Sequence, residues 1–172
     1  MFTSQSRVVK HGTLLCLDVH PAVVEAISRP VIDAGYEVVR ETRATAGDKI
    51  AAAAVVLADL RAPGPALPGL DGRILVALLA KETPVPVGAV EILVDPGDPD
   101  EILAAVDRGL ARHRLAAVTE SLQAPIKLLV EAVREAEATY DSGGASAARP
   151  HLERIRDALA DLERRVDAID DD

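Results

Sequence analysis

Short apolar runs alternate with helical patterns in the first part of the chain. Runs of four to eight apolar residues bounded by turn residues are typical of buried strands. Residues 20–35 and 46–53, which lie between the first three runs, have the apolar spacing of helices. Strands separated by helices predict a parallel sheet and an α/β fold. The five predicted strands cover residues 13–18, 37–40, 54–60, 73–80 and 91–94.

Two later stretches are too rich in proline to follow the same alternation. Residues 62–72 contain three prolines and three glycines, and residues 81–87 contain two prolines. Proline lacks the backbone N–H that a helix needs, so we expect the third and fourth helices to be lost or shortened. Pro30 lies inside the helical pattern of residues 20–35, where we expect it to kink or split the helix.

The chain becomes helical from Asp98 onward and stays so. Asp98, Pro99 and Glu101 have the order of a helix N-cap, a first-turn proline and a capping-box acid. A second apolar stripe, out of phase with the first, begins at residue 115. A loop is predicted over 141–149, followed by another helix. The residues expected to form a heptad seam are Leu129, Val133, Leu152, Ile155, Leu159, Leu162, Val166 and Ile169.

Two helices joined by a short loop usually pack antiparallel. Such a hairpin buries only one face of each helix, and two hairpins can close a four-helix bundle. We therefore predict a homodimer, with the alternative that the stripes fold back on the α/β part. The predicted organisation is a flexible arm over 1–11, an α/β domain over 12–114 and a helical hairpin over 115–172.

Composition and charge narrow the classes of function. The formal net charge of -9 argues against nucleic acid and against an anionic membrane surface, because both are bound through Lys and Arg. No apolar run reaches the roughly 20 residues that span a bilayer. A single cysteine permits no internal disulfide and no cysteine-based metal site. We expect a cytoplasmic protein without a metal or another cofactor.

The ends of the predicted strands resemble the receiver domain of response regulators over residues 13–115. In that family, the first strand ends in two acidic residues, and Asp18 stands at the first of these positions. The third strand ends in the phosphate-accepting aspartate, and Asp59 stands there. The resemblance implies a five-stranded parallel sheet and a role in two-component signalling.

Three positions depart from the family pattern. Val19 replaces the second acidic residue, Leu79 stands where a Thr or Ser normally ends the fourth strand, and Asp95 replaces the lysine after the fifth. Phosphorylation of an aspartate needs a divalent cation, and also a cation and a hydroxyl to hold the phosphoryl oxygens. The resemblance therefore implies a degenerate, non-enzymatic receiver. The alternative for Asp18 and Asp59 is that they only cap loops at the carboxyl edge of the sheet.

The helical hairpin resembles the dimerisation and phosphotransfer helices of histidine kinases. Leu122, Pro125 and Ile126 match the segment after the phosphorylated histidine, but Glu120 stands in the place of that histidine. A carboxylate cannot replace the imidazole, so the resemblance implies no phosphotransfer by this route. The alternative is a generic coiled-coil dimeriser with an incidental proline.

These patterns favour a dimeric adaptor or regulator in a two-component-type pathway, with a response regulator or a histidine kinase as its partner. One alternative is a phosphoacceptor response regulator that uses Asp59 in an unusual pocket. Another is a structural coiled-coil assembly protein.

Overall fold

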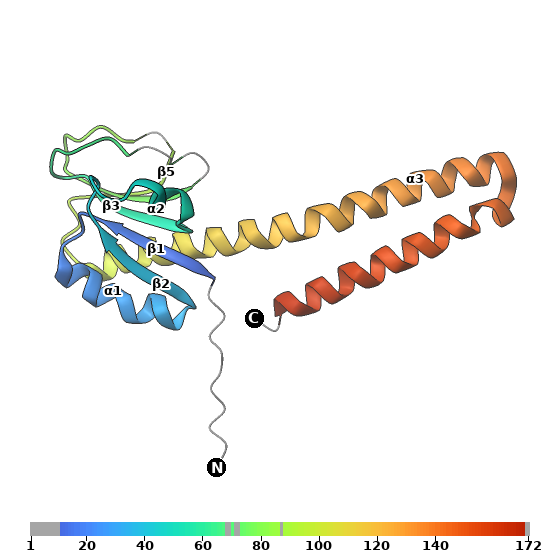
Figure 1. Ribbon diagram of the computed structural model, residues 1–172, viewed down its shortest axis with the longest axis horizontal. Coiled ribbons are helices and arrows are strands. Elements are labelled where there is room, and N and C mark those ends of the chain that lie inside the picture. The colour runs from blue at the N-terminus through green and yellow to red at the C-terminus, as the bar shows by residue number, and fades with distance from the viewer. Residues whose placement is uncertain (1–10, 68–69, 71–72, 87, 171–172) are drawn as a thin grey trace, which may run out of the picture. The chain divides into compact units, whose positions relative to one another are not determined.

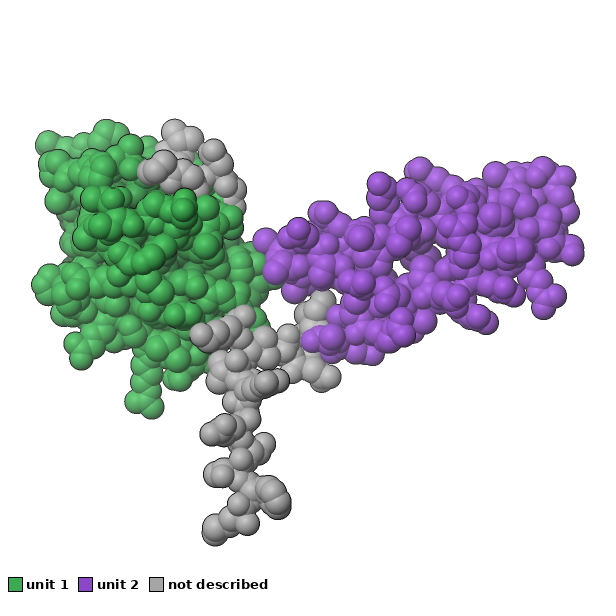
Figure 2. Space-filling view, viewed as in Figure 1, with its two compact units in different colours: residues 1–114 green, residues 115–172 purple. Residues whose placement is uncertain are grey.

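The computed structural model describes residues 11–67, 70, 73–86 and 88–170, so the predicted arm lies outside the described residues except for its last position, His11 (Figure 1). The chain forms two compact units, Met1–Arg114 and Leu115–Asp172 (Figure 2). The elements are β1 (Gly12–Leu17), α1 (Pro21–Asp33), β2 (Tyr36–Glu41), α2 (Gly47–Ala52), β3 (Val55–Asp59), β4 (Ile74–Leu79), β5 (Ala89–Val94) and α3 (Pro99–Asp170).

The first unit contains a five-stranded sheet in which every neighbouring pair is parallel. The strand order is β2-β1-β3-β4-β5, which confirms the predicted receiver-like α/β fold. In register, Leu14 of β1 lies between Val38 of β2 and Val55 of β3. Because all five strands run the same way, their carboxyl ends meet at one edge, where open α/β sheets usually bind their ligands.

The two faces of the sheet bury separate aliphatic clusters. Helix α1 and the first turns of α3 cover one face, through residues such as Ile27, Val106 and Leu110. Helix α2 covers the other face through Ile50 (Figure 1). Both sides of the central strands are therefore buried, which explains why these strands are continuous apolar runs in the sequence.

The connections after β3 and β4 hold no helix in their described parts, in agreement with the prediction from their prolines. Leu60, Leu67 and Leu70 pack instead against the cluster beneath α2. The irregular loop thus takes over part of the covering role of a helix on this face.

Helix α1 continues through Pro30 to Asp33, so the expected split of this helix does not occur. The proline lies in the last turns, where it removes only one intrahelical hydrogen bond. Ile27 and Val31, on either side of it, are fully buried and hold the helix against the sheet. Tertiary packing here outweighs the local penalty.

Helix α3 begins as predicted, since the carboxylate of Asp98 accepts a hydrogen bond from the backbone N–H of Asp100 at 2.9 Å. The predicted break between two helices does fall within 141–149, but it is shorter than the predicted loop. The helix runs through this segment with one non-helical residue, Gly144, at φ 72° and ψ -172°. Glycine alone readily adopts this conformation, so a single residue makes the bend and Pro150 lies inside the helix.

The bend divides the second unit into a first arm, residues 115–143, and a second arm, residues 145–170 (Figure 1). Contacts between residues far apart in sequence show that the arms pack antiparallel. Ala132 and Ala136 of the first arm and Ala148 of the second are buried. The polar contacts are Thr139 Oγ1 with His151 Nε2 at 3.3 Å, Arg154 Nη1 with Glu135 Oε2 at 2.5 Å, and Arg165 Nη1 with the carbonyl oxygen of Ser121 at 3.4 Å.

An aromatic cluster anchors α3 to the start of the sheet within the first unit. The hydroxyl of Tyr36 lies 3.2 Å from Nδ1 of His113 and donates to the carbonyl oxygen of Leu110 at 3.4 Å. The ring of Tyr36 also contacts His11, with centroids 5.7 Å apart. Desolvation, followed by the charges of His11 and Arg73, lowers the pKa of His113 from its usual 6.5.

We predict that His113 makes the stability of the first unit depend on pH. Because its pKa is lower folded than unfolded, neutral His113 contributes stability above pH 6.5, and this contribution is lost as the pH falls below that value. Urea unfolding at a series of pH values should show a smaller acid-induced loss for His113→Gln than for the wild type. Equal losses in the two proteins would contradict the assignment.

We predict that Gly144→Ala destabilises the hairpin, because alanine is strained at this φ and ψ. The expected cost is about 1–3 kcal/mol in the free energy of unfolding, measured by thermal melts followed at a helical circular dichroism band. Gly97→Ala is the matched control, since a Cβ at Gly97 meets nothing within 4 Å. An equal effect at the two glycines would show that the bend does not need the glycine.

Candidate functional site

The carboxyl edge of the sheet gathers the residues that the sequence singled out. Asp18 follows β1, Asp59 ends β3, Leu79 ends β4 and Asp95 follows β5. These four strands are neighbours in the sheet. The backbone N–H of Asp95 donates to the carbonyl oxygen of Leu79 at 2.8 Å, which ties the last two positions together. The structure thus brings the predicted acceptor pocket to one edge.

Asp59 is held by Arg61 through both of its carboxylate oxygens. Arg61 Nη2 donates to Oδ2 at 2.5 Å, and Nε donates to Oδ1 at 2.9 Å. The backbone N–H of Arg61 also donates to Oδ1 at 3.1 Å. The side chain of Asp59 is only 14% exposed. This fork-to-fork geometry is the strong form of an arginine–carboxylate pair.

The ion pair determines the charge state of both residues. Burial alone would raise the pKa of Asp59, but the hydrogen bonds and charge of Arg61, together with the charge of Arg43, bring it below its usual value. The same pair raises the pKa of Arg61, and the carboxylate of Asp95 adds to that rise. Asp59 is therefore an anion with a cation already beside it.

A second arginine holds Asp18. Arg43 Nε donates to Asp18 Oδ2 at 2.5 Å, and the backbone N–H of Arg43 donates to Oδ1 at 3.2 Å. Arg43 Nη2 donates to the carbonyl oxygen of Ala62 at 2.9 Å, which connects the pair to the proline-rich loop. The side chain of Arg43 is 7% exposed, and a Cβ added at Gly64 would lie 2.5 Å from its Cζ. The glycine makes room for the buried guanidinium.

The three substituted positions lie at this edge in different environments. Val19 and Leu79 are both 1% exposed, and they pack into opposite core clusters. Asp95 is exposed and has the positive φ of 46°, and Asp18 has a positive φ of 55°. Two of the three positions therefore serve the core, and the third adds negative charge to the edge.

Sequence reasoning missed both arginines. Arg61 lies two residues after Asp59, so its spacing was a usable signal for a local pair. Arg43 lies 25 residues from Asp18 in sequence, and only the pairing of β2 with β1 brings the two together. Within the described residues, no three His, Cys, Asp or Glu side chains converge as metal ligands would.

The residues that resemble the segment around the phosphorylated histidine of histidine kinases, the histidine-box pattern, lie along the first arm of the hairpin. Glu120 is exposed, Leu122 is half-buried and Pro125 is buried. Ile126 is 46% exposed. The helix continues through Pro125, whose ring lies on the side facing the second arm.

The residues predicted as one dimer seam fall into two groups. Leu129, Ile155 and Leu162 are half-buried in the hairpin. Four others are exposed, and the side chain of Ile169 lies outside the described residues. The exposed members are Val133, Leu152, Leu159 and Val166.

None of the helices in the described parts of the chain is both long and apolar enough to cross a membrane.

No protein-family model matches the chain, and no curated protein matches it. Among solved structures, it is similar to the chemotaxis response regulator CheY4 of Vibrio cholerae, with 24% identity over 57% of this chain and 98% of that one and a TM-score of 0.43. It is also similar to full-length FixJ from B. japonicum, with 17% identity over 91% and 90% of the two chains and a TM-score of 0.48. A receiver protein from Sinorhizobium medicae has 20% identity over 59% and 96%, with a TM-score of 0.45.

All three scores lie below 0.5. The fold is defined by the strand order and register of the chain itself. That order, β2-β1-β3-β4-β5 with all strands parallel, is receiver-like.

We predict that Arg61→Ala raises the pKa of Asp59, because burial then acts without the hydrogen bonds that oppose it. Carboxyl NMR titration of Asp59 measures the change directly. In the wild type, the lowered pKa of Asp59 adds to the free energy of unfolding at neutral pH, and this contribution is lost as the pH falls through that pKa. The acid-induced loss of stability should be smaller in Arg61→Ala. Lys49→Ala removes the cation paired with Glu41 at the same edge, and it should leave Asp59 unchanged.

Proposed function

We propose that the protein is a cytoplasmic, non-enzymatic adaptor or regulator in a two-component-type pathway, and that it acts by protein–protein contact without conventional phosphorylation. The observation that carries this proposal is the bidentate pair between Arg61 and Asp59. Both oxygens of the acceptor-position carboxylate are engaged by a guanidinium of the same chain.

The chemistry of aspartate phosphorylation explains why this pair matters. The carboxylate must attack phosphorus with one oxygen while a divalent cation shares the charge of the carboxylate and phosphoryl oxygens. In this site, Arg61 provides a fixed cation to Asp59, and Arg43 does the same for Asp18. A metal ion would have to displace at least one of these charge-assisted pairs before it could bind.

The substituted positions support the same proposal. Val19 offers no ligand to a metal, and Leu79 offers no hydroxyl to a phosphoryl oxygen. Asp95 would repel a phosphoryl group, whereas a cation would stabilise it. Losing one preorganised group of this kind typically costs about 3 kcal/mol of transition-state stabilisation.

The proposed adaptor is a homodimer formed through its hairpin, and its other partner is a response regulator or a histidine kinase. Support for the hairpin comes from its exposed apolar residues, including Leu152, Leu159 and Val166. Support for the partner class comes from the receiver-like sheet and from the histidine-box pattern around Glu120.

A second candidate is a phosphoacceptor regulator that uses Asp59 in an atypical way. It is favoured by the position of Asp59 at the end of β3 and by its ionised state, since a carboxylate must be an anion to attack. In that case, release of Arg61 would have to precede the chemistry.

We predict that acetyl phosphate and Mg²⁺ leave no stable phosphoryl group on Asp59. The measurements are the intact mass of the protein and peptide mapping carried out at acidic pH. An ordinary receiver domain, run in parallel, controls for the donor. Stable labelling of wild-type Asp59 that disappears in Asp59→Asn would contradict the proposal. Labelling that arises only in Arg61→Ala would identify the ion pair as the block.

A further inference from the structure

One face of the hairpin exposes large apolar side chains at a regular spacing. We name this set of six residues the outer stripe. Each member lies seven residues from the next on its own arm, which is close to two helical turns, so the members of one arm share a face. Their exposed fractions lie between 37% and 59%. The outer stripe consists of Ile126, Val133 and Tyr140 on the first arm and Leu152, Leu159 and Val166 on the second.

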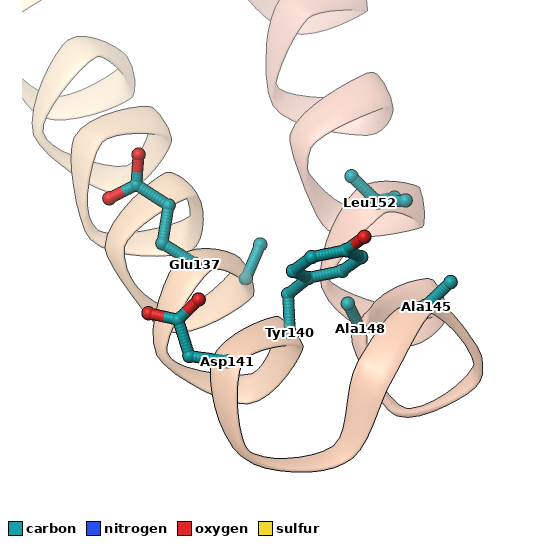
Figure 3. Close-up of a pocket in the computed structure, with 7 residues that line it drawn as sticks. Glu137, Tyr140, Asp141, Ala145, Ala148 and Leu152 are labelled. Carbon is teal, nitrogen blue, oxygen red and sulfur yellow. The ribbon is translucent and has the colours of Figure 1, made fainter.

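A hollow near the bend shows that both arms turn these residues toward the same side. It has a volume of about 520 Å³ and is lined by Glu137 and Tyr140 from the first arm and Leu152 from the second. Ala136 and Ala148, which are buried, also line it. In Figure 3, the ring of Tyr140 lies between the two arms, near Leu152 and Ala148. At the bend, the two halves of the outer stripe therefore meet on one side of the hairpin, and the seven-residue spacing carries each half along its arm.

The antiparallel register interleaves the two halves of the outer stripe. The contacts of Thr139 with His151 and of Ser121 with Arg165 fix which residues of the two arms lie level. Side chains from the two arms then alternate along the face, as in the seam of a helical bundle. From the bend outward, the order is Tyr140, Leu152, Val133, Leu159, Ile126 and Val166.

We propose that the outer stripe binds the outer stripe of a second copy of this chain, and that the two hairpins lie side by side with their bends at the same end. This inference rests on the homodimer of the proposed function and adds its contact surface and its orientation. The stripe between the arms, with Leu129 and Ile155, closes each hairpin, and the outer stripe joins two hairpins.

The size of the face fits a stable dimer. The first arm has 29 residues from 115 to 143, so it is about 43 Å long at 1.5 Å per residue. Two helices side by side are about 20 Å wide, since neighbouring axes lie about 10 Å apart. The face is thus roughly 800 Å², the area that each partner contributes to a standard specific interface.

Charges beside the outer stripe favour bends at the same end. Glu137 borders the hollow on the first arm, and Arg149 and Arg156 lie within about one turn of Leu152 on the second arm. With the bends together, the first arm of each copy lies beside the second arm of the other, and Glu137 comes level with these arginines. With the bends at opposite ends, each first arm lies beside the first arm of the other copy, so Glu137 does not face these arginines and this charge complementarity is lost.

The test is the mass of the full chain in solution, measured by sedimentation equilibrium. The wild type should have twice the 18.1 kDa of one chain. Leu159→Glu places an unpaired charge in the seam and should weaken dimerisation by at least about 100-fold. Leu128→Glu is the matched control: Leu128 is 59% exposed but lies about 120–160° around the helix from the first-arm members of the outer stripe, so this variant should remain dimeric.

A charge exchange tests the same surface without a change of apolar area. Glu137→Arg should weaken the dimer, and adding Arg156→Glu to the same chain should restore it. Circular dichroism checks that each variant keeps its helices. A dimeric Leu159→Glu, or a Leu128→Glu that dissociates to the same extent, would overturn the inference.

Spin labels test the orientation. Burial raises the pKa of the Cys16 thiol to about 12, although Arg40 opposes the rise, so a label reacts selectively at Ser142→Cys beside the bend. Bends at the same end predict a label separation under about 30 Å, because the labelled helices belong to one bundle. A separation of about 40 Å or more, close to the arm length, would overturn the orientation.

A failure of the dimer inference can be distinguished from a failure of the proposed function. A monomeric wild type overturns this inference but leaves the unphosphorylated state of Asp59 untouched, because that state is measured by mass. If the monomer binds a response regulator and Leu159→Glu abolishes that binding, the outer stripe belongs to that partner instead.

Discussion

Parallel pairing of β1 between β2 and β3 is the constraint on which the rest of the first unit depends. It buries both faces of the central strands, so each face needs its own cover, supplied by α1 and α3 on one side and by α2 with the proline-rich loop on the other. It also directs every strand end to one edge. Asp18 and Asp59, which are 41 residues apart in sequence, become neighbours in the same site for this reason alone.

At that edge, two arginine side chains balance the charges of two aspartates, so no cation from outside the chain is needed for that balance. Arg61 neutralises Asp59, and Arg43 neutralises Asp18 while also holding the loop through Ala62. The negative charges at the edge are thereby largely compensated within the protein. The buried guanidinium of Arg43, with Gly64 packed against it, is a structural element that ties the end of β1 to the proline-rich loop.

The hairpin follows a different constraint. Its small residues Ala132, Ala136 and Ala148 let the arms approach closely, and its larger apolar residues are divided between the inner and outer sides. One apolar side of the helix pair packs between the arms, and the other apolar side stays exposed in a single chain. The bend at Gly144 keeps the arms in one register, so the outer side remains an ordered surface.

The sequence by itself determined the strands, the parallel character of their sheet, the missing helices and the helical second unit, because apolar periodicity and proline placement act locally. It also located Asp59 at the end of a strand, and Val19, Leu79 and Asp95 as the positions that depart from the pattern the chain resembles. Only the tertiary structure decided that Pro30 is tolerated, that one glycine replaces a nine-residue loop, and that Arg43 reaches Asp18. It also divided the heptad seam between two faces. These features depend on contacts between segments distant in sequence, and the spacing of residues along one helix cannot show which side meets its neighbour.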